Sequence, residues 1–269
     1  MIELTNVSVK YPGDVIALQQ TSLHFKRGEL CVLLGASGAG KSTLLRCLNL
    51  LNRPTTGSVR TQDVGVIEGR AALQLHRRRT GMIFQQHQLI SRQTALANVL
   101  LGRVGYHPTW RTLFPLARKE QQIALECLDR VGLLEKATER VDHLSGGQQQ
   151  RVGIARALAQ QPRLMLADEP VASLDPASSR RVLSQLKRIG REDGITTIIS
   201  LHQVDLACEY ADRVVGLAHG RVVFDGAPDG LTDAVLHMIY AQAPAVASRE
   251  SVPASPVPSH SLDLVIIED

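Results

Sequence analysis

The chain has 269 residues, of which 44% are hydrophobic and 21% are charged, and its formal net charge is +4. This composition indicates a soluble globular protein with a sizeable core, and no apolar run approaches the roughly 18 residues of a membrane-spanning helix. Aromatic residues make up only 3%, so neither a base-stacking platform nor a nucleic-acid partner is expected.

The first part of the chain predicts short strands separated by turns. Apolar residues alternate over 2–9, which predicts a strand with one buried side that ends in a turn. A second strand is predicted at 18–25, short edge strands at 58–67, and a further strand at 79–84. The cluster Arg77-Arg78-Arg79 is interpreted as a solvated loop.

A glycine-rich segment follows the apolar run 31–34 and precedes leucines at helical spacing. The phosphate-loop pattern G-x-x-x-x-G-K-[ST] is matched by Gly35-Ala36-Ser37-Gly38-Ala39-Gly40-Lys41-Ser42-Thr43. Glycines let backbone N–H groups turn around a polyphosphate, and the helix start adds positive charge. Lys41 is expected to reach the β- and γ-phosphates, and Ser42 to ligate Mg²⁺. A glycine-rich turn with a surface lysine is the alternative, which the strand–loop–helix context disfavours.

The middle of the chain, from about 85 to 162, changes to helical periodicity. Helices are predicted at 94–103, 119–131 and 146–160. The stretch 105–115 between the first two is interpreted as a connector with the exposed aromatics Trp110 and Phe114.

Strands then alternate with helices again, which predicts a parallel α/β core. Strands are expected at 164–167, 196–201, 214–217 and 222–224, and helices at 176–189 and 204–210. After about 242 the sequence is rich in Ala, Pro and Ser, which predicts a disordered tail at 243–269.

Four cysteines, none in a C-x-x-C pair, are expected to be reduced thiols of a cytosolic protein, without a structural disulfide or zinc. They are Cys31, Cys47, Cys127 and Cys208. The N-terminus shows no basic and then apolar leader, so no signal peptide is expected.

Two carboxylates end the apolar run 164–167. If this strand lies next to the P-loop strand, Asp168 is near the metal and holds Mg²⁺ directly or through water. Glu169 then faces the nucleotide and orients or deprotonates the water that attacks the γ-phosphorus. Two acids in a surface turn are the alternative, and the P-loop disfavours it.

A second helix start suited to an anion lies at Leu144–Arg151. Ser145 can cap the helix, while Gly146 and Gly147 leave its N–H groups uncovered. One γ-phosphate needs only one such helix start, so the second one needs another explanation. A head-to-tail pair of chains, each completing the other's site, is one solution, although spacing alone does not establish it.

The motifs Gly35–Thr43, Leu144–Arg151 and Asp168-Glu169-Pro170, followed by Ser173-Leu174-Asp175, resemble the nucleotide-binding domain of an ATP-binding-cassette (ABC) ATPase over residues 1–240. The resemblance implies an α/β fold. Its parts are a P-loop NTPase (RecA-like) core, an N-terminal antiparallel β subdomain and an inserted α-helical signature subdomain at about 86–162. The domain is expected to span 1–242, and the cofactors are ATP and Mg²⁺.

The resemblance also implies roles for single residues. The segment Ser145-Gly146-Gly147 would form the signature loop, which contacts the γ-phosphate of ATP on the opposite subunit. Gln85 fits the Q-loop glutamine, which senses Mg²⁺ and the attacking water and links the site to the membrane partner; Gln86 beside it is the alternative. Asp175 fits the loop that crosses the dimer interface.

Two further residues match the family pattern. His202 follows a predicted buried strand and fits the switch histidine, which contacts the γ-phosphate; a structural histidine is the alternative. Tyr11 fits the aromatic residue that stacks on adenine, although a turn tyrosine can also simply pack.

Within the family, three stretches resemble phosphonate-import ATPases: 84–90, 109–114 and 201–207. This implies import of phosphonates, phosphite or phosphate esters. A homodimer would work with two permease subunits and a periplasmic binding protein, at the cytoplasmic face of the inner membrane. The alternatives are import of another solute, such as a polar amino acid, and a non-transport ABC ATPase of cell division. One departure from the common ABC pattern, Val171-Ala172-Ser173-Leu174-Asp175, keeps the aspartate.

Overall fold

The computed structural model describes residues 2–85, 88–108, 110 and 114–240. The predicted tail and part of the predicted connector lie outside these residues.

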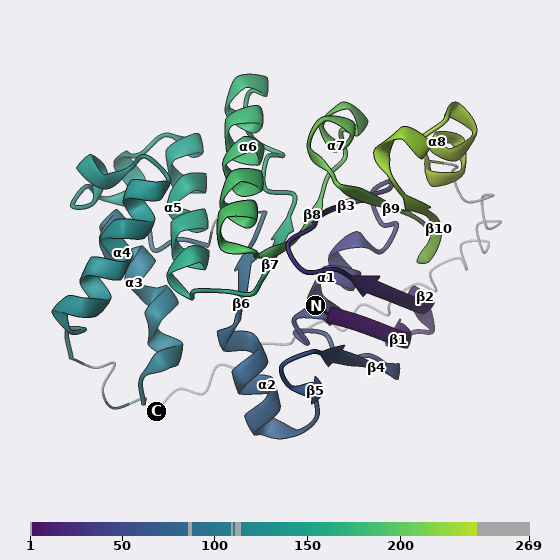
Figure 1. The fold of residues 1–269 in the computed structure, drawn as a ribbon, viewed down its shortest axis with the longest axis horizontal. Helices are drawn as coiled ribbons and strands as arrows, with labels where there is room; N and C mark the ends of the chain where they lie inside the picture. Colours follow the sequence, from purple (N-terminus) through teal and green to yellow (C-terminus); the bar gives the residue numbers. More distant parts are fainter. Residues whose placement is uncertain (1, 86–87, 109, 111–113, 241–269) are drawn as a thin grey trace, which may run out of the picture.

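The N-terminal residues form a small antiparallel sheet (Figure 1). Its strand order is β2-β1-β4-β5. The strands are β1 (Ile2–Tyr11), β2 (Val15–Phe25), β4 (Thr56–Thr61) and β5 (Gly65–Val66). Ile2, Leu4, Val7 and Val9 are buried, as the alternation in the sequence predicted. The expected antiparallel β subdomain is confirmed.

The core is a six-stranded sheet with the order β10-β9-β3-β8-β7-β6. Its strands are β3 (Leu30–Leu34), β6 (Thr80–Ile83), β7 (Leu164–Asp168), β8 (Thr196–Ser200), β9 (Arg213–Ala218) and β10 (Arg221–Gly226). All neighbours pair in parallel except β9 and β10. Every residue of β3, β7 and β8 is buried, as expected for parallel strands that are covered on both faces.

The expectation that the strand before Asp168 lies next to the P-loop strand is wrong. Strand β7 does not adjoin β3. Strand β8 lies between them and pairs in parallel with both. A chain can return to either side of a strand through a helical crossover, so the sequence order of buried strands does not fix their spatial order.

Helices cover the core sheet and form a separate group beside it (Figure 1). The core helices are α1 (Lys41–Leu48), α2 (Gly69–Arg78), α6 (Pro176–Asp193), α7 (Val204–Tyr210) and α8 (Asp233–Tyr240), with a 3₁₀ turn η5 (Pro228–Gly230). The inserted group contains α3 (Ala95–Leu100), η1 (Leu101–Tyr106), α4 (Arg118–Arg130), η3 (Leu134–Lys136), η4 (Val141–His143) and α5 (Gly146–Ala159). Sequence analysis predicted neither α2 nor α8.

Two hydrophobic cores lie on opposite faces of the core sheet. Val32 and Leu34 pack with residues of the inserted helices and α6, whereas Cys31 and Leu33 pack with α1 and the antiparallel sheet. Successive residues of one strand point to opposite faces, so β3 joins both cores.

The arginine cluster predicted as a solvated loop instead ends α2. The Arg77 guanidinium donates to the Leu50 carbonyl at 2.6 Å, beyond the end of α1. Arg78 lies over the Tyr106 ring at 4.9 Å from its centroid. Only His76 of α2 is buried, and a helix with so few core residues is hard to recognise from its hydrophobic pattern in the sequence.

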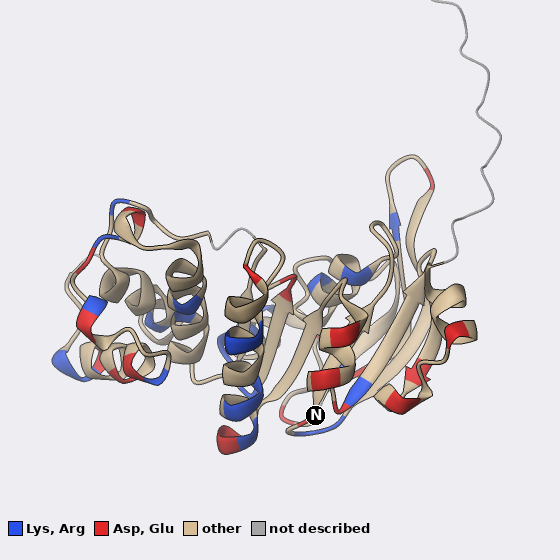
Figure 2. Cartoon of the chain, turned by 90° about the horizontal axis from the view of Figure 1, so that it is seen from above, with Lys and Arg blue, Asp and Glu red and all other residues tan. Residues whose placement is uncertain are grey.

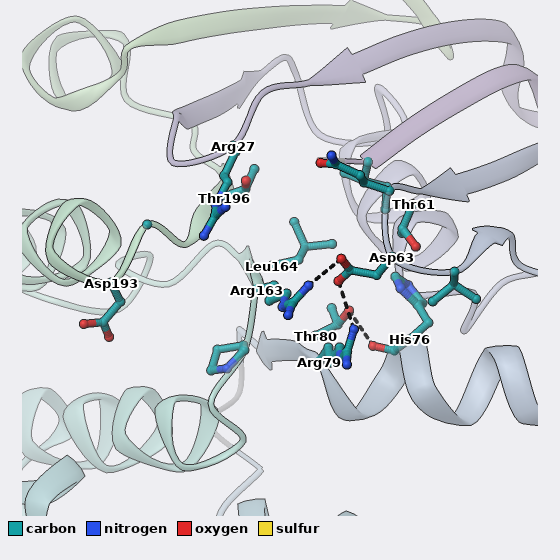
Figure 3. Close-up of a pocket in the computed structure, with 15 residues that line it drawn as sticks. Arg27, Thr61, Asp63, His76, Arg79, Thr80, Arg163, Leu164, Asp193 and Thr196 are labelled. Atoms are coloured by element: carbon teal, nitrogen blue, oxygen red, sulfur yellow. Dashed lines mark hydrogen bonds and ion pairs between the residues drawn. The ribbon is translucent and has the colours of Figure 1, made fainter.

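Polar contacts link the antiparallel subdomain to the core sheet (Figure 3). Asp63, in the turn between β4 and β5, accepts from Arg79 at 3.1 Å and is paired with Arg163. Arg79 precedes β6 and Arg163 precedes β7, so the turn is fixed at the amino ends of these strands.

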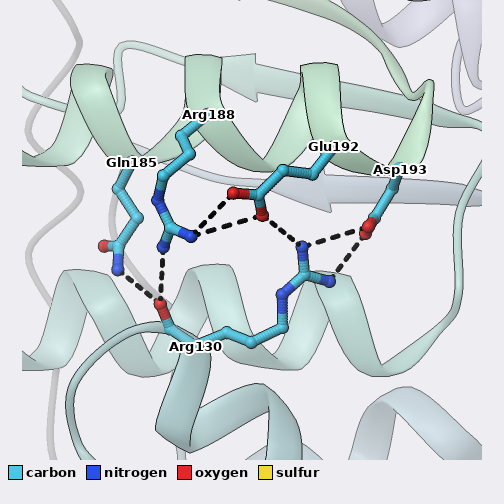
Figure 4. Close-up of polar contacts among 5 residues, drawn as sticks. All are labelled: Arg130, Gln185, Arg188, Glu192 and Asp193. Carbon is cyan, nitrogen blue, oxygen red and sulfur yellow. Dashed lines mark hydrogen bonds and ion pairs between the residues drawn. The ribbon is translucent and has the colours of Figure 1, made fainter.

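A second set of contacts joins the inserted helices to α6 (Figure 4). The Arg130 guanidinium on α4 donates to Asp193 at 2.6 Å and lies 3.4 Å from Glu192. Its carbonyl accepts from Gln185 at 2.8 Å. Figure 2 shows basic and acidic residues interspersed over the molecule.

All four cysteines are free, and three are buried while Cys208 on α7 is exposed. Burial raises the pKa of Cys47 to about 12 and that of Cys127 to about 11. Among the described residues, no helix combines the length and apolarity that crossing a membrane requires.

A buried ion pair organises the inserted helices. Arg103 is 4% exposed and donates to Glu120 at 2.5 Å and to the Ala159 carbonyl at 2.7 Å. Its guanidinium also lies over the Tyr106 ring, at 3.9 Å from the centroid. One side chain therefore connects η1, α4 and the end of α5.

Arg103→Ala is expected to lower the free energy of unfolding by about 3–5 kcal/mol, because it leaves a buried carboxylate without its guanidinium. Urea denaturation at neutral pH measures the change. Lys10→Ala is the control, since its ammonium forms an exposed i,i+4 pair with Asp14; a loss below about 1 kcal/mol is expected there. Equal losses in the two variants would contradict the role of the Arg103–Glu120 pair in stabilising the inserted helices.

Candidate functional site

The P-loop connects β3 directly to α1. Gly38 and Gly40 have φ angles of 79° and 105°, in the region that side chains other than glycine rarely adopt. A Cβ atom on Gly40 would lie 2.7 Å from the Ala17 carbonyl oxygen, and one on Gly35 would lie 2.5 Å from the Leu217 oxygen. The glycines of the motif are thus required by close backbone packing as well as by the turn.

The turn between β9 and β10 packs against the P-loop and is hydrogen-bonded to it. The Gly220 N–H donates to the Ala39 carbonyl at 3.0 Å, and the Gly220 carbonyl accepts from the Gln19 N–H at 2.7 Å. A Cβ on Gly220 would lie 3.0 Å from the Ala17 oxygen. Sequence analysis missed this contact, because it joins segments that are far apart in the chain.

Lys41 at the start of α1 is buried, with 4% of its surface exposed. Its ammonium donates to the carbonyls of Gly35 at 2.7 Å and Ala36 at 3.0 Å. Burial lowers the pKa of Lys41, and the nearby Glu169 and Asp168 oppose this effect. The backbone of the loop thus holds the ammonium at its centre, where a polyphosphate would bind.

Ser42 on α1 and Asp168 at the end of β7 lie together. Strand β8 nevertheless separates β7 from β3, the strand that leads to the P-loop. The Ser42 hydroxyl donates to Asp168 Oδ1 at 2.9 Å, and the Ser200 hydroxyl at the end of β8 donates to the same oxygen at 2.8 Å. A hydroxyl and a carboxylate are hard oxygen ligands of the kind that Mg²⁺ prefers. The donor set therefore fits Mg²⁺. Sequence analysis assigned no role to Ser200, although it lies in a predicted strand two residues before His202.

Glu169 is held from both sides. Gln85 Nε2, after β6, donates to Glu169 Oε2 at 2.9 Å, and His202 Nε2, after β8, lies 2.5 Å from Oε1. The structure thus brings together the three residues that the sequence named for water activation. The alternative, Gln86, lies outside the described residues.

The predicted signature residues and Asp175 form a second group. Ser145 caps α5, accepting from the Gln148 N–H at 3.3 Å, and the Gln148 side chain accepts from the Ser145 N–H at 2.9 Å. Asp175 caps α6 and accepts from the Ser178 N–H at 2.9 Å. Hydrogen bonding to the Ser178 side chain, and then to its N–H, lowers the Asp175 pKa.

Both caps, with Gly146 and Gly147, line one cleft. Among the contacts of the described residues, no hydrogen bond or ion pair joins this cleft to the P-loop. The predicted site residues thus divide into two groups within the chain.

The predicted adenine-stacking residue, Tyr11, lies at the end of β1 with 39% of its surface exposed, and its hydroxyl accepts from Asn52 at 2.6 Å. Trp110 and Phe114 are 66% and 61% exposed. The prediction that the connector carries exposed aromatics is confirmed.

A phosphate-binding loop, two acids at the carboxyl end of another parallel core strand and a separate cleft of capped helix starts define an ATP-binding cassette. Comparison with protein families agrees: a family model described as "ABC transporter" matches residues 18–172.

Similar proteins share most of the chain. The phosphonates import ATP-binding protein PhnC 3 of Nostoc sp. is 64% identical over 243 residues, covering 90% of this chain and 93% of that protein. The phosphite import ATP-binding protein PxtA of Stutzerimonas stutzeri is 64% identical over 241 residues, covering 90% and 87%. The chain belongs to the ATP-binding proteins of ABC transporters, and its predicted resemblance to phosphonate-import ATPases is confirmed.

Solved structures match the fold. The dimeric ATP-binding cassette MJ0796, in a post-hydrolysis state bound to ADP and Pi, superposes with a TM-score of 0.75 at 34% identity, covering 85% of this chain and 99% of that chain. A second dimeric structure of MJ0796 gives the same TM-score at 35% identity, with the same coverage. The predicted fold class is confirmed, and cassettes of this family form dimers.

Gly220→Ala is expected to raise the Kd for ATP about tenfold, equal to about 1.4 kcal/mol. The new Cβ would displace the turn that supports the P-loop. Gly65→Ala is the matched control, because Gly65 has φ 75° against 74° for Gly220 but nothing within 4 Å of its Cβ position.

The control should lose about 1–2 kcal/mol of stability from backbone strain alone and keep its ATP affinity. Isothermal titration calorimetry and urea denaturation separate the two effects. Equal Kd values for the two variants would show that the turn does not support the P-loop.

Proposed function

We propose that the chain is the ATP-hydrolysing subunit of an ABC importer for phosphonates, or for the related phosphite or phosphate esters. The observation that carries ATP hydrolysis is the contact of Glu169 with both Gln85 and His202, beside Lys41. The cargo rests on the relatives at 64% identity, which are named for phosphonate and phosphite import.

The nucleotide binds through the P-loop in this proposal. Backbone N–H groups of Gly35–Thr43 surround the phosphates, and the N-terminus of α1 adds its partial positive charge. Lys41 exchanges its carbonyl contacts for the β- and γ-phosphate oxygens. Tyr11 stacks on the adenine ring.

The metal site is formed by oxygen ligands. Ser42 and Asp168 would hold Mg²⁺ directly or through water, and Gln85 would contact it. When bound, Mg²⁺ offsets the negative charge of the β- and γ-phosphates. The contact between Ser42 and Asp168 supports this assignment.

Glu169 orients the attacking water and accepts its proton, and His202 contacts the γ-phosphate. The carboxylate accepts hydrogen bonds from Gln85 and His202 on its two different oxygens, and each oxygen keeps a further acceptor site for water. Hydrolysis then depends on positioning and on charge stabilisation rather than on a covalent intermediate.

The second site group acts in the partner subunit. Ser145, Gly146 and Gly147 contact the γ-phosphate of ATP bound to the opposite chain of a homodimer, and Asp175 lies at the interface. This accounts for the separation of the cleft from the P-loop, and the solved relative is dimeric. Two permease subunits and a periplasmic binding protein complete the complex, with the ATPase at the cytoplasmic face of the inner membrane.

Glu169→Gln is expected to lower kcat about 100-fold or more, because the amide does not accept a proton from water. ATP binding should remain, and the variant should accumulate as a closed dimer with ATP in size-exclusion chromatography. Glu209→Gln is the control, since Glu209 forms an exposed pair with Arg180 and should keep normal turnover. Near-normal turnover of Glu169→Gln would remove Glu169 from this role.

The cargo is tested with the assembled transporter in liposomes. A phosphonate-loaded periplasmic binding protein is expected to stimulate ATP hydrolysis several-fold, because cargo release and nucleotide closure are thermodynamically coupled. The empty binding protein is the control. Stimulation by an amino-acid-loaded binding protein, and not by the phosphonate-loaded one, would defeat the phosphonate assignment.

A further inference from the structure

Ser200 occupies the last position of β8, between the strand that leads to the P-loop and the strand that carries the two acids. Its surface is 0% exposed, and it pairs in register with Asp168 of β7. The fold thus places a buried hydroxyl directly beside both carboxylate-bearing residues.

The direction of its two hydrogen bonds is fixed. The backbone N–H of Glu169 can only donate, and it donates to Ser200 Oγ at 2.8 Å. The hydroxyl proton of Ser200 therefore goes to Asp168 Oδ1, also at 2.8 Å. One hydroxyl thus contacts both residues that the proposed function assigns to metal binding and water activation.

The Asp168 carboxylate is oriented by this arrangement. Ser42 and Ser200 both donate to Oδ1. Among the contacts recorded for the described residues, none involves Oδ2. The pair of hydroxyls therefore fixes the rotation of the carboxylate and leaves Oδ2 for another ligand, as partners behind a metal ligand commonly do.

The backbone of Glu169 also depends on Ser200. Glu169 has φ 48°, a left-handed conformation that is uncommon for this residue and persists only where the surroundings impose it. The Ser200 hydroxyl holds the N–H of this turn, and the turn directs the side chain toward Gln85 and His202.

We propose that Ser200 is a positioning residue, which sets the Asp168 carboxylate for Mg²⁺ and the Glu169 turn for water activation. This inference rests on the proposed roles of these two acids. Ser200 touches neither nucleotide nor metal in the proposal, so its loss should affect kcat and the metal-dependent part of nucleotide binding. Metal-free binding of ATP should be unaffected.

The test compares Ser200→Ala and Ser200→Cys with the wild-type full chain. Alanine removes the hydroxyl, and cysteine has a slightly larger side chain that is only a weak donor. Both variants should lose about tenfold or more in kcat, and their KM for ATP in Mg²⁺ should rise in parallel with the Kd. The ratio between the ATP Kd in EDTA and the Kd in Mg²⁺, measured by calorimetry, should fall about tenfold in both.

Thr197→Val is the matched control. Thr197 lies on the same strand and is 2% exposed, and among the described residues its hydroxyl makes only a long hydrogen bond of 3.5 Å to the Ile195 carbonyl. It should keep both kcat and the Kd ratio, and thermal unfolding of all variants reports general destabilisation. An unchanged kcat and Kd ratio in both Ser200 variants would overturn the proposal, as would equal effects in Thr197→Val.

Glu169→Gln, assayed alongside, separates this inference from the proposed function. If Glu169→Gln loses turnover while the Ser200 variants do not, only the positioning role fails. If Glu169→Gln also turns over normally, the proposed function fails.

Discussion

The parallel alignment of four core strands is the constraint on which the site depends. Strands β3, β8, β7 and β6 run in the same direction, so their carboxyl ends meet at one edge of the sheet. Open α/β sheets bind ligands at this edge. Each strand end supplies one part of the site: the P-loop, the segment with Ser200 and His202, the two acids, and Gln85.

Charged side chains are buried at this edge of the sheet, and the folded chain must provide each of them with polar partners. Lys41 and Asp168 are 4% and 6% exposed, and an unpaired charge is costly at such depth. Carbonyl oxygens of the P-loop hold the ammonium, and two hydroxyls hold the carboxylate. A polyphosphate with its cation would bring opposite charges to both groups, so the arrangement is suited to binding a charged ligand.

The sequence predicted those parts of the site that depend on local pattern. The P-loop, the capped start at Ser145 and the acids after β7 each need only a short run of residue types in order. The order of the strands in the sheet is different, because the packing of whole βα units sets it. The residues of a single strand do not reveal which strands lie beside it. The expectation that β7 adjoins β3 failed for this reason.

The contribution of Ser200 could not be foreseen for the same reason, since it arises only when β8 lies between those strands. Helix α2 was missed because only one of its residues, His76, is buried. Its C-terminal arginines contact the segment after α1 and the Tyr106 ring of η1, and hydrophobic periodicity does not reveal such contacts.

The distribution of the cysteines has a practical consequence for observing this molecule at work. Three thiols are buried, whereas Cys208 is exposed on α7, the helix that begins two residues after His202. Thiol reactivity requires access and the thiolate form, so a maleimide dye or spin label added to the folded chain attaches at this one position. The unaltered chain therefore already carries a single position for a spectroscopic reporter, on the helix that follows the histidine that contacts Glu169.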